Sequence, residues 1–401
     1  MERDKHILEG IRVLDFTAFV AGPYCTMLLA DFGADIVKIE SPENGDGARF
    51  WGKSTDGRSP VFAATNTNKR SLMLDLKQPE AREIVSRLVE RSDIAAEAFS
   101  PGVAARLGIG YDDLRAQKPN IIYCSVSGFG QTGPLRNKPG FDMALQAHTG
   151  IMSMTGEPGA APVRVGPAAI DILTGSLAFG AICMALYDRA QTGQGQYIDV
   201  SLFDSSMSML SYAVVEYFSV GHKHQPSGGQ HPNIVPYGVF KAQDRYFYFG
   251  IALERHWSRF CEKLGIGDIA SDPRFATNES RINHRQELND RLNTLFARKP
   301  AKEWVQEIEE IGIPANLIHH VGEACDHPHT AAREAVVDIP GMPGWKTPGI
   351  PIKLVRSPGE VRATPPVAGG DSKELLLESG FSAKEVDKFI STGLVHQAQG
   401  A

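Results

Sequence analysis

Short apolar stretches alternate with longer amphipathic ones in the first third of the chain. Residues 11–16 and 36–39 have the composition of buried strands, and Gly22 and Gly33 mark the start and the end of a helix between them. The same alternation recurs between residues 72 and 126. Because strand–helix–strand units lay their strands in parallel, the pattern predicts an α/β fold, a doubly wound sheet with helices on its faces.

A long run of small and apolar residues, from 171 to 189, predicts a helix that is buried on nearly all sides and ends at a glycine-rich turn. A second helix is predicted at about 204–220. The loop that follows, 222–236, is rich in His, Pro and Gly, and we place the main domain boundary there.

The chain beyond this loop is organised differently. Residues 237–250 alternate in the way that predicts a hairpin, and the amphipathic helices after it indicate a smaller α+β domain. From about residue 336 the chain is rich in Pro and Gly. We therefore predict three segments. They are 1–222, the N-terminal part of a large domain, 223–330, the small domain, and 331–401, a C-terminal segment that returns to the large domain.

Charge and composition exclude several classes of partner. The 401 residues carry a formal net charge of −6, whereas binding to nucleic acid or to an anionic membrane surface needs a basic excess. The five cysteines are scattered without Cys-x-x-Cys spacing, which is typical of reduced thiols. The N-terminus lacks an apolar signal, and the longest mostly apolar stretch, 172–187, is short for a bilayer. We predict a cytoplasmic protein without a membrane partner.

Two motifs point to chemistry that their context does not favour. Residues 128–133 read Gly-Phe-Gly-Gln-Thr-Gly, as in a dinucleotide-binding turn, but Pro134 follows at once, so no helix is expected to open there. Histidines gather at His222 and His224 and again within 319–329, yet no pair has the spacing of an established zinc site. The sequence therefore predicts neither a nicotinamide or flavin cofactor nor a metal.

Asp171 is the strongest candidate for chemistry. It begins the long predicted helix, where free amides and the helix dipole stabilise a carboxylate. An aspartate in this position is commonly a plain helix cap. Small neighbours, Gly166, Ala168, Ala169 and Gly175, would also leave room for a ligand to approach. The residues alone leave both interpretations open.

A series of motifs runs through nearly the whole chain. They are VLDFTAFVAGPYCTMLLADFGADIVKIE (13–40), NTNKRSLMLDLK (66–77), EAFSPGVAARLG (97–108), SGFGQTGP (127–134), PGFD (139–142), the segment around Asp171, TGQGQYIDVSLFD (192–204), PYGVF (236–240), DPRF (272–275) and GIP (312–314). In this order they resemble the family III CoA-transferases, which include formyl-CoA transferase and the α-methylacyl-CoA racemases. The resemblance implies a Rossmann-like large domain built from both chain ends, a smaller α+β domain, and a homodimer of interlinked subunits.

The resemblance also implies a mechanism. Asp171 matches the nucleophile, which forms a mixed anhydride with the donor acyl group and then an aspartyl-CoA thioester. Asp142 matches an acidic residue that assists near the nucleophile. Gly228 and Gly229 match a glycine loop that shields the intermediates from water. Coenzyme A and its acyl esters are then substrates, and no cofactor is expected to be bound permanently.

Several residues match the family positions that contact CoA. They are Phe19, Val20, Ala21, Leu74, Lys77, Phe99, Arg106 and Leu107. The chain departs from the family at Ala98, where an asparagine is usual, and at Ser41, where formyl-CoA transferase often has arginine. We therefore expect Lys38 or Lys138 to compensate for the lost contacts with the nucleotide.

The resemblance leaves a choice between transferase and racemase. The racemase branch has a histidine directly before the residue that matches Asp142, and this chain has Phe141 there. A phenyl ring cannot carry a proton, so the sequence favours the transferase. An epimerase of the α-methylacyl-CoA racemase type and a non-catalytic CoA-binding protein are the alternatives.

The substrate is expected to carry a second carboxylate. Cations near the motif segments could bind it, namely Arg49, Arg70, Arg164, His148 and His231. The predicted donor is succinyl-CoA, and the predicted acceptor is a C4 or C5 dicarboxylate such as itaconate, malate, mesaconate or citramalate. The same cations could instead pair with CoA phosphates or with surface carboxylates.

Overall fold

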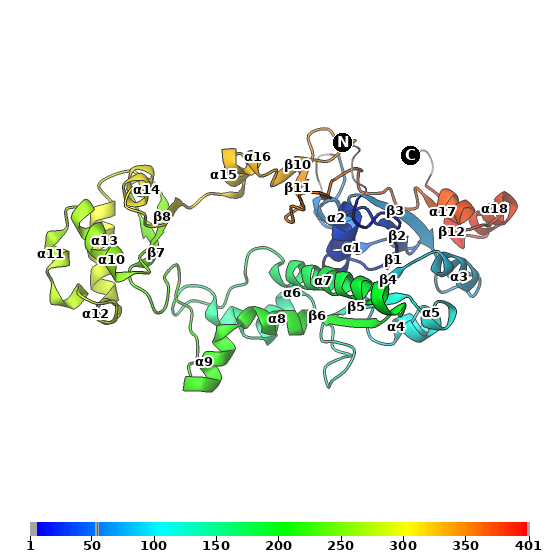
Figure 1. The fold of residues 1–401 in the computed structure, drawn as a ribbon, viewed down its shortest axis with the longest axis horizontal. Coiled ribbons are helices and arrows are strands. Elements are labelled where there is room, and N and C mark those ends of the chain that lie inside the picture. Colours follow the sequence, from blue (N-terminus) through cyan, green and yellow to red (C-terminus); the bar gives the residue numbers. More distant parts are fainter. Residues whose placement is uncertain (1–5, 53, 55, 399–401) are drawn as a thin grey trace. The chain divides into compact units, whose positions relative to one another are not determined.

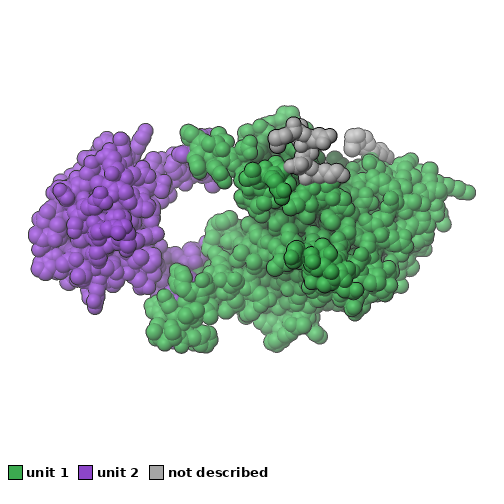
Figure 2. Space-filling view, viewed as in Figure 1, with its two compact units in different colours: residues 1–151, 165–222, 328–401 green, residues 152–164, 223–327 purple. Residues whose placement is uncertain are grey.

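The chain divides into two compact units, coloured separately in Figure 2. The computed structural model describes residues 6–52, 54 and 56–398. Residues 1–151, 165–222 and 328–401 form the first unit, and residues 152–164 and 223–327 form the second. The second unit thus ends three residues earlier than we expected.

Residues 152–164 were expected in the large domain, and this placement is wrong. They belong to the second unit. The Gly228 amide donates a hydrogen bond of 2.9 Å to the carbonyl of Gly156, which ties the segment to the small unit. The Glu157 carboxylate also lies against Gly228, so contacts between distant parts of the chain, which composition does not encode, assign this segment to the second unit.

A seven-stranded sheet forms the centre of the first unit (Figure 1). Its strands, in spatial order, are β12 (Val395–His396), β3 (Lys69–Leu74), β2 (Asp35–Glu40), β1 (Arg12–Phe16), β4 (Ile94–Glu97), β5 (Ile122–Ser127) and β6 (Tyr197–Ser201). Neighbouring strands are parallel except β12, which runs antiparallel to β3. The predicted doubly wound α/β layer is therefore confirmed.

Helices cover both faces of this sheet (Figure 1). On β1, Val13 and Leu14 point to opposite faces and enter two separate hydrophobic clusters, as consecutive strand residues must. The helical elements of the first unit are α1 (Ala21–Asp31), η1 (Gly47–Phe50), α2 (Pro60–Asn66), α3 (Ala81–Glu90), α4 (Val103–Arg106), α5 (Tyr111–Gln117), α6 (Asp142–His148), α7 (Ala169–Thr192), α8 (Leu202–Leu210), α9 (Tyr212–Val220), α16 (Pro328–Ala332), α17 (Ser372–Glu378) and α18 (Ala383–Ser391). The short η2 (Ile151–Met154) lies at the change from the first unit to the second. A short antiparallel pair, β10 (Val336–Asp338) and β11 (Lys346–Pro348), completes the unit.

Two expectations about the helices are wrong. The helix expected at 204–220 is divided into α8 and α9 at Ser211, whose φ of 44° lies outside the helical range. The helix α7 is not buried on nearly all sides, since Met184 and Tyr187 are 69% and 72% exposed. By length and composition α7 is also the one helix of the described residues that could cross a membrane, a property it shares with core helices of soluble proteins.

The second unit has its own sheet and core. The strands β7 (Tyr237–Lys241), β8 (Tyr246–Gly250) and β9 (Ala315–Leu317) are antiparallel, and β7 and β8 form the predicted hairpin. Aromatic and aliphatic side chains of this sheet form one hydrophobic cluster with side chains of the helices α10 (Glu254–Lys263), α11 (Gly267–Ala270), η3 (Pro273–Phe275), α12 (Asn278–Asn283), α13 (Arg285–Phe296) and α14 (Ala301–Glu309). The helix α15 (Val321–Cys325) has no buried residue.

Candidate active site

Asp171 lies inside the first turn of α7, not at its cap. The helix starts at Ala169, and the cap position is Ala168, whose methyl side chain cannot accept a hydrogen bond. The expectation that Asp171 begins the helix is therefore wrong by two residues. Among the described residues none donates a hydrogen bond to the Asp171 carboxylate, which lines a cavity of about 260 Å³. The carboxylate is available for chemistry because it does not accept a capping hydrogen bond from the amides of α7.

Asp142, the first residue of α6, caps α7 from outside. Its Oδ2 accepts hydrogen bonds from the backbone amides of Ile170 at 2.8 Å and of Asp171 at 3.3 Å. Its Oδ1 accepts a bond of 2.5 Å from Nε2 of Gln146, and Oε1 of Gln146 accepts the amide of Val165 at 2.9 Å. Gln146 is fully buried and Asp142 is 8% exposed. The chain thereby fixes the start of α7 through a second helix.

The environment of Asp171 disfavours its charge. Burial, followed by the negative charge of Asp142, raises the pKa of Asp171 to about 7. A buried carboxyl beside a second carboxylate holds its proton more tightly, because its ionised form loses hydration and meets a like charge. Near neutral pH the group is consequently divided between its acid and its nucleophilic form.

The cavity lies where the strand order of the sheet reverses. The connections run outward from β1 to β2 and β3 on one side, and the chain continues through β4 and β5 on the other. Loops after the carboxyl ends of β1, β4 and β5 line the cavity, which is the usual ligand position in doubly wound folds. The lining residues are Ala18, Phe19, Val20, Ala21, Gly22, Trp51, Ala98, Phe99, Ser100, Pro101, Val126, Ser127, Gly128, Arg136, Lys138, Pro139, Gly140, Phe141, Asp171 and Leu202.

Five of the predicted CoA-contact residues border this cavity together with Asp171. They are Phe19, Val20, Ala21, Phe99 and Lys138. The N-terminal turn and the two later loops are far apart in the sequence, and the ends of parallel strands bring them together. The motif at 128–133 contributes Gly128, and no helix opens between it and α6, where every residue is described.

The other four predicted contacts lie outside the described lining of the cavity. Leu74 is 1% exposed, and Leu107 packs against the same hydrophobic cluster. Lys77 forms an exposed ion pair with Glu43 at 3.3 Å. Arg106 lies on the surface in the last turn of α4. The structure therefore gives Leu74 a place in the core and does not bring these four side chains to Asp171.

Lys38 cannot supply the contact that we expected of it. It is fully buried in β2, where its Nζ donates to the carbonyl of Thr17 and lies 2.8 Å from a carboxylate oxygen of Asp46. Lys138 lines the cavity, so of the two candidates it alone is placed to meet a ligand there. A lysine in a strand that is buried on both sides looks the same in sequence as one that faces solvent.

Most cations considered for a second carboxylate are engaged elsewhere. Arg49 pairs with Glu40 at 2.7 Å, and Arg70 pairs with Asp35 and Glu378, each at 2.8 Å. His148 packs its ring against Phe129 and Phe203. Arg164 and His231 belong to the second unit. Internal carboxylates therefore already pair with Arg49 and Arg70, and neither side chain is among the described residues that line the cavity with Asp171.

The sequence did not point to Trp51 and Arg136 as lining residues, and it identified Phe141 only as the residue in place of the racemase histidine. The rings of Trp51 and Phe19 are tilted against each other with their centroids 5.0 Å apart, and Phe141 meets the Phe19 ring edge-on at 5.8 Å. Arg136 adds a second cation two residues before Lys138. The nearby lysine was the available signal for Arg136, whereas nothing in the sequence around Trp51 indicates that it approaches the turn at Phe19.

The predicted glycine loop lies in the second unit. Gly228 has a φ of 62°, and a β-carbon there would clash with the carboxylate of Glu157. Only glycine therefore fits this turn without rearrangement.

Comparison with known proteins gives a consistent result. A family model described as CoA-transferase family III matches residues 8–372. A protein of Agrobacterium fabrum named succinate–glutarate CoA-transferase is 36% identical over 94% of this chain and 97% of its own. A succinyl-CoA–D-citramalate CoA-transferase of Chloroflexus aurantiacus is 34% identical over 94% of this chain and 95% of its own. The crystal structure of a CaiB/BaiF family protein from Brucella suis superposes with a TM-score of 0.86 at 34% identity, over 94% of this chain and all of that one.

Proposed function

This chain belongs to CoA-transferase family III, and on that premise we propose that it moves coenzyme A between two carboxylic acids through covalent intermediates on Asp171. The observation that carries the proposal is the Asp171 carboxylate, which lines a cavity together with five residues expected to contact CoA and is not used as a helix cap. Its pKa of about 7 leaves a nucleophilic fraction at neutral pH.

The proposed reaction begins with two steps that consume the donor thioester: its acyl group is transferred to Asp171, and CoA then replaces that acyl group on Asp171. A carboxylate oxygen of Asp171 attacks the thioester carbonyl, the carbon–sulfur bond breaks, and a mixed anhydride and the CoA thiolate result. The thiolate then attacks the Asp171 carbonyl of the anhydride, which releases the donor acid as a carboxylate and leaves an aspartyl-CoA thioester.

The acceptor reverses these steps. Its carboxylate attacks the aspartyl thioester and displaces the CoA thiolate, and the thiolate then attacks the acceptor carbonyl of the new anhydride. The products are the acceptor CoA thioester and the free Asp171 carboxylate. No proton is gained or lost over the cycle, and the thioester bond is conserved.

Asp142 is proposed to hold Asp171 in place. Its hydrogen bonds to the amides of Ile170 and Asp171 support this role, since they fix the turn that carries the nucleophile. We propose Gly228 and Gly229 as the loop that shields the intermediates, and the left-handed conformation of Gly228 supports a requirement for glycine there. Asp171→Asn is expected to abolish turnover whereas Asp142→Asn only lowers it.

The proposed donor is succinyl-CoA and the proposed acceptor is a C4 or C5 dicarboxylate, in the cytoplasm. The names of the glutarate and citramalate relatives support this class. Arg136 and Lys138 support it physically, because two cations on the cavity lining could bind the remote carboxylate of an acid whose other end meets Asp171. Succinyl-CoA and acetyl-CoA, each offered with a panel of mono- and dicarboxylates, separate the possibilities when the products are identified by mass.

A homodimer of interlinked subunits is also proposed. Its support is the apolar surface of the first unit, where Tyr187 of α7 and Phe218 of α9 are 72% and 80% exposed. Large apolar side chains that are exposed on these two helices are typical of surfaces that another protein covers, and a second copy of the chain is the partner we propose.

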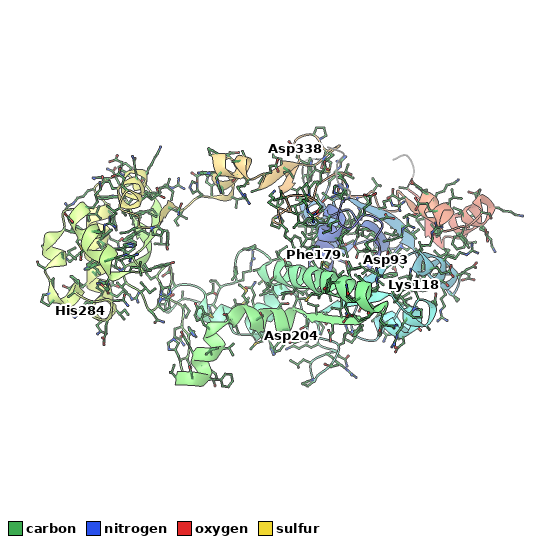
Figure 3. The ribbon with its side chains drawn as sticks, in the orientation of Figure 1. Asp93, Lys118, Phe179, Asp204, His284 and Asp338 are labelled. Atoms are coloured by element: carbon green, nitrogen blue, oxygen red, sulfur yellow. The ribbon has the colours of Figure 1, made fainter. Side chains whose placement is uncertain are left out.

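Trapping the covalent intermediate tests the proposed function. The protein is incubated with succinyl-CoA and quenched with hydroxylamine, which converts an aspartyl thioester into a hydroxamate that peptide mass spectrometry locates. We expect the label on Asp171 and its loss in Asp171→Ala. The matched control is Asp93→Asn, since Asp93 (Figure 3) lies at the amino end of β4 and pairs with Arg189 at 3.0 Å. If no acyl-CoA labels the protein, the proposed mechanism is wrong.

A further inference from the structure

Phe19 has a backbone conformation that is unfavourable for its residue type. Its φ is 69°, in the left-handed region that glycine adopts at little cost and a phenylalanine does not. Phe19 also lines the cavity that contains Asp171. A strained residue at a functional site persists only where its surroundings hold it, so the contacts of this turn indicate what maintains it.

Buried charged side chains hold the turn from three directions. Oδ1 of Asp15 accepts the amide of Thr17 at 3.0 Å, and Nζ of Lys38 donates to the carbonyl of Thr17 at 2.8 Å. Oδ1 of Asp46 accepts the amide of Phe19, also at 3.0 Å. The backbone on either side of Ala18 is thereby fixed by side chains from β1, β2 and the loop after β2.

Lys38 and Asp46 form an ion pair without contact with solvent. Their charged atoms lie 2.8 Å apart, and their side chains are 0% and 1% exposed. Burial acts to lower the pKa of Lys38, but the carboxylates of Asp15, Asp46 and Glu40 outweigh it and raise that pKa. A buried pair of this kind adds little net stability, because desolvation offsets the attraction, although it fixes geometry.

Asp46 also fixes a second part of the cavity lining. Its Oδ1 accepts the amide of Ala48 at 2.9 Å and so caps η1, which leads directly to Trp51. A β-carbon on Gly47 would lie 2.6 Å from the Phe19 ring, so the ring rests on bare backbone. One carboxylate therefore connects the turn at Phe19 with the segment that carries Trp51.

We propose that Lys38 and Asp46 are positioning residues for the CoA ester: they hold the turn at Thr17–Phe19 and the segment at Trp51 in one arrangement beside Asp171. Neither side chain is among the described residues that line the cavity, so both act through the backbone. The inference rests on the proposed function, since it assumes that CoA occupies this cavity.

Two substitutions of Asp46 test the inference. Asp46→Asn keeps an oxygen acceptor for the amides of Phe19 and Ala48, whereas Asp46→Ala removes it. We expect the calorimetric Kd for CoA to rise at least about tenfold in Asp46→Ala, which loses two hydrogen bonds to a charged group, and clearly less in Asp46→Asn. The KM for succinyl-CoA should follow the Kd, while the KM for the acceptor acid stays nearly constant.

Arg189→Met is the matched control. Arg189 forms a largely buried ion pair with Asp93 at the amino end of the sheet, so its loss tests the effect of removing any such pair from this unit. It should change thermal stability without changing CoA affinity. Hydrogen exchange of peptides that contain Phe19 should accelerate in Asp46→Ala and not in Arg189→Met.

The outcomes separate this inference from the proposed function. Absence of CoA binding by the unaltered protein overturns both. Binding by the unaltered protein, with an equal Kd in Asp46→Ala, overturns the positioning role alone. If Asp46→Ala does not fold, the comparison uses the double variant Lys38→Met/Asp46→Asn. This variant removes the charges of both Lys38 and Asp46, so neither is left buried without its partner, and it also removes the hydrogen bond from Lys38 to the carbonyl of Thr17. An unchanged Kd in that variant refutes the inference equally.

Discussion

The activity should rise with pH through the neutral range, because Asp171 must be ionised to attack a thioester. Burial, with a further contribution from the charge of Asp142, raises the pKa of this carboxyl to about 7. With that pKa, about one molecule in ten carries the nucleophile at pH 6 and about nine in ten at pH 8. We therefore expect kcat/KM for succinyl-CoA to increase about tenfold between these two pH values.

Asp142→Asn tests the cause of the shift. The substitution removes one negative charge but keeps an oxygen that can accept the Ile170 amide. Without the like charge the ionised form of Asp171 is less disfavoured, so its pKa falls and the midpoint of the profile moves to lower pH. Burial is the larger cause and remains, so the pKa should stay above its ordinary value.

The assay is the pH profile of kcat/KM for succinyl-CoA, which reports groups of the free enzyme. The unaltered protein and Asp142→Asn are compared in buffers of equal ionic strength, with unfolding monitored at each pH to exclude loss of structure. A flat profile between pH 6 and pH 8, or a midpoint that Asp142→Asn does not move, would refute this account of the nucleophile.

Three further substitutions test separate parts of the structure. Asp142→Ala leaves the amides of Ile170 and Asp171 without their cap, and urea unfolding should show a loss of about 1–2 kcal/mol. Gly47→Ala would bring a β-carbon to 2.6 Å from the Phe19 ring. The Kd for CoA should therefore rise, and the free energy of CoA binding that is lost should exceed the loss in free energy of unfolding. Tyr187→Glu places a charge on the exposed apolar face of α7, and native mass spectrometry should show a shift from dimer to monomer.

The sheet was predictable from the sequence because its strands are buried on both faces. Consecutive residues such as Val13 and Leu14 enter different clusters, which requires the continuous apolar runs that mark parallel strands. The edge strand β12 was not predictable. It pairs only two residues with β3, which lies more than 300 positions earlier in the chain, and no local pattern encodes such a partner.

The site was predictable where its residues follow strand ends. Phe19 follows β1 and Phe99 follows β4, and the carboxyl ends of parallel strands converge at one edge. The errors concern the direction of side chains. Lys38 looked like a ligand for an anion, but β2 buries it against Asp46. For Asp171 the residues alone left a cap and a ligand-facing carboxylate both open, and the structure takes the capping carboxylate from Asp142, which precedes α7 by a whole helix and a loop.

The raised pKa of Asp171 has a consequence for the covalent intermediates. Burial and the charge of Asp142 disfavour the ionised carboxylate, and acylation removes that charge just as protonation does. On the proposed route, the anhydride and the aspartyl-CoA thioester are neutral at Asp171, so the same environment favours their formation from the carboxylate. Asp142→Asn should therefore lower the fraction of protein trapped as adduct at saturating succinyl-CoA, even at pH 8 where Asp171 is largely ionised in both proteins. An adduct fraction that rises or stays constant would show that the surroundings of Asp171 raise its pKa without stabilising the acyl-enzyme.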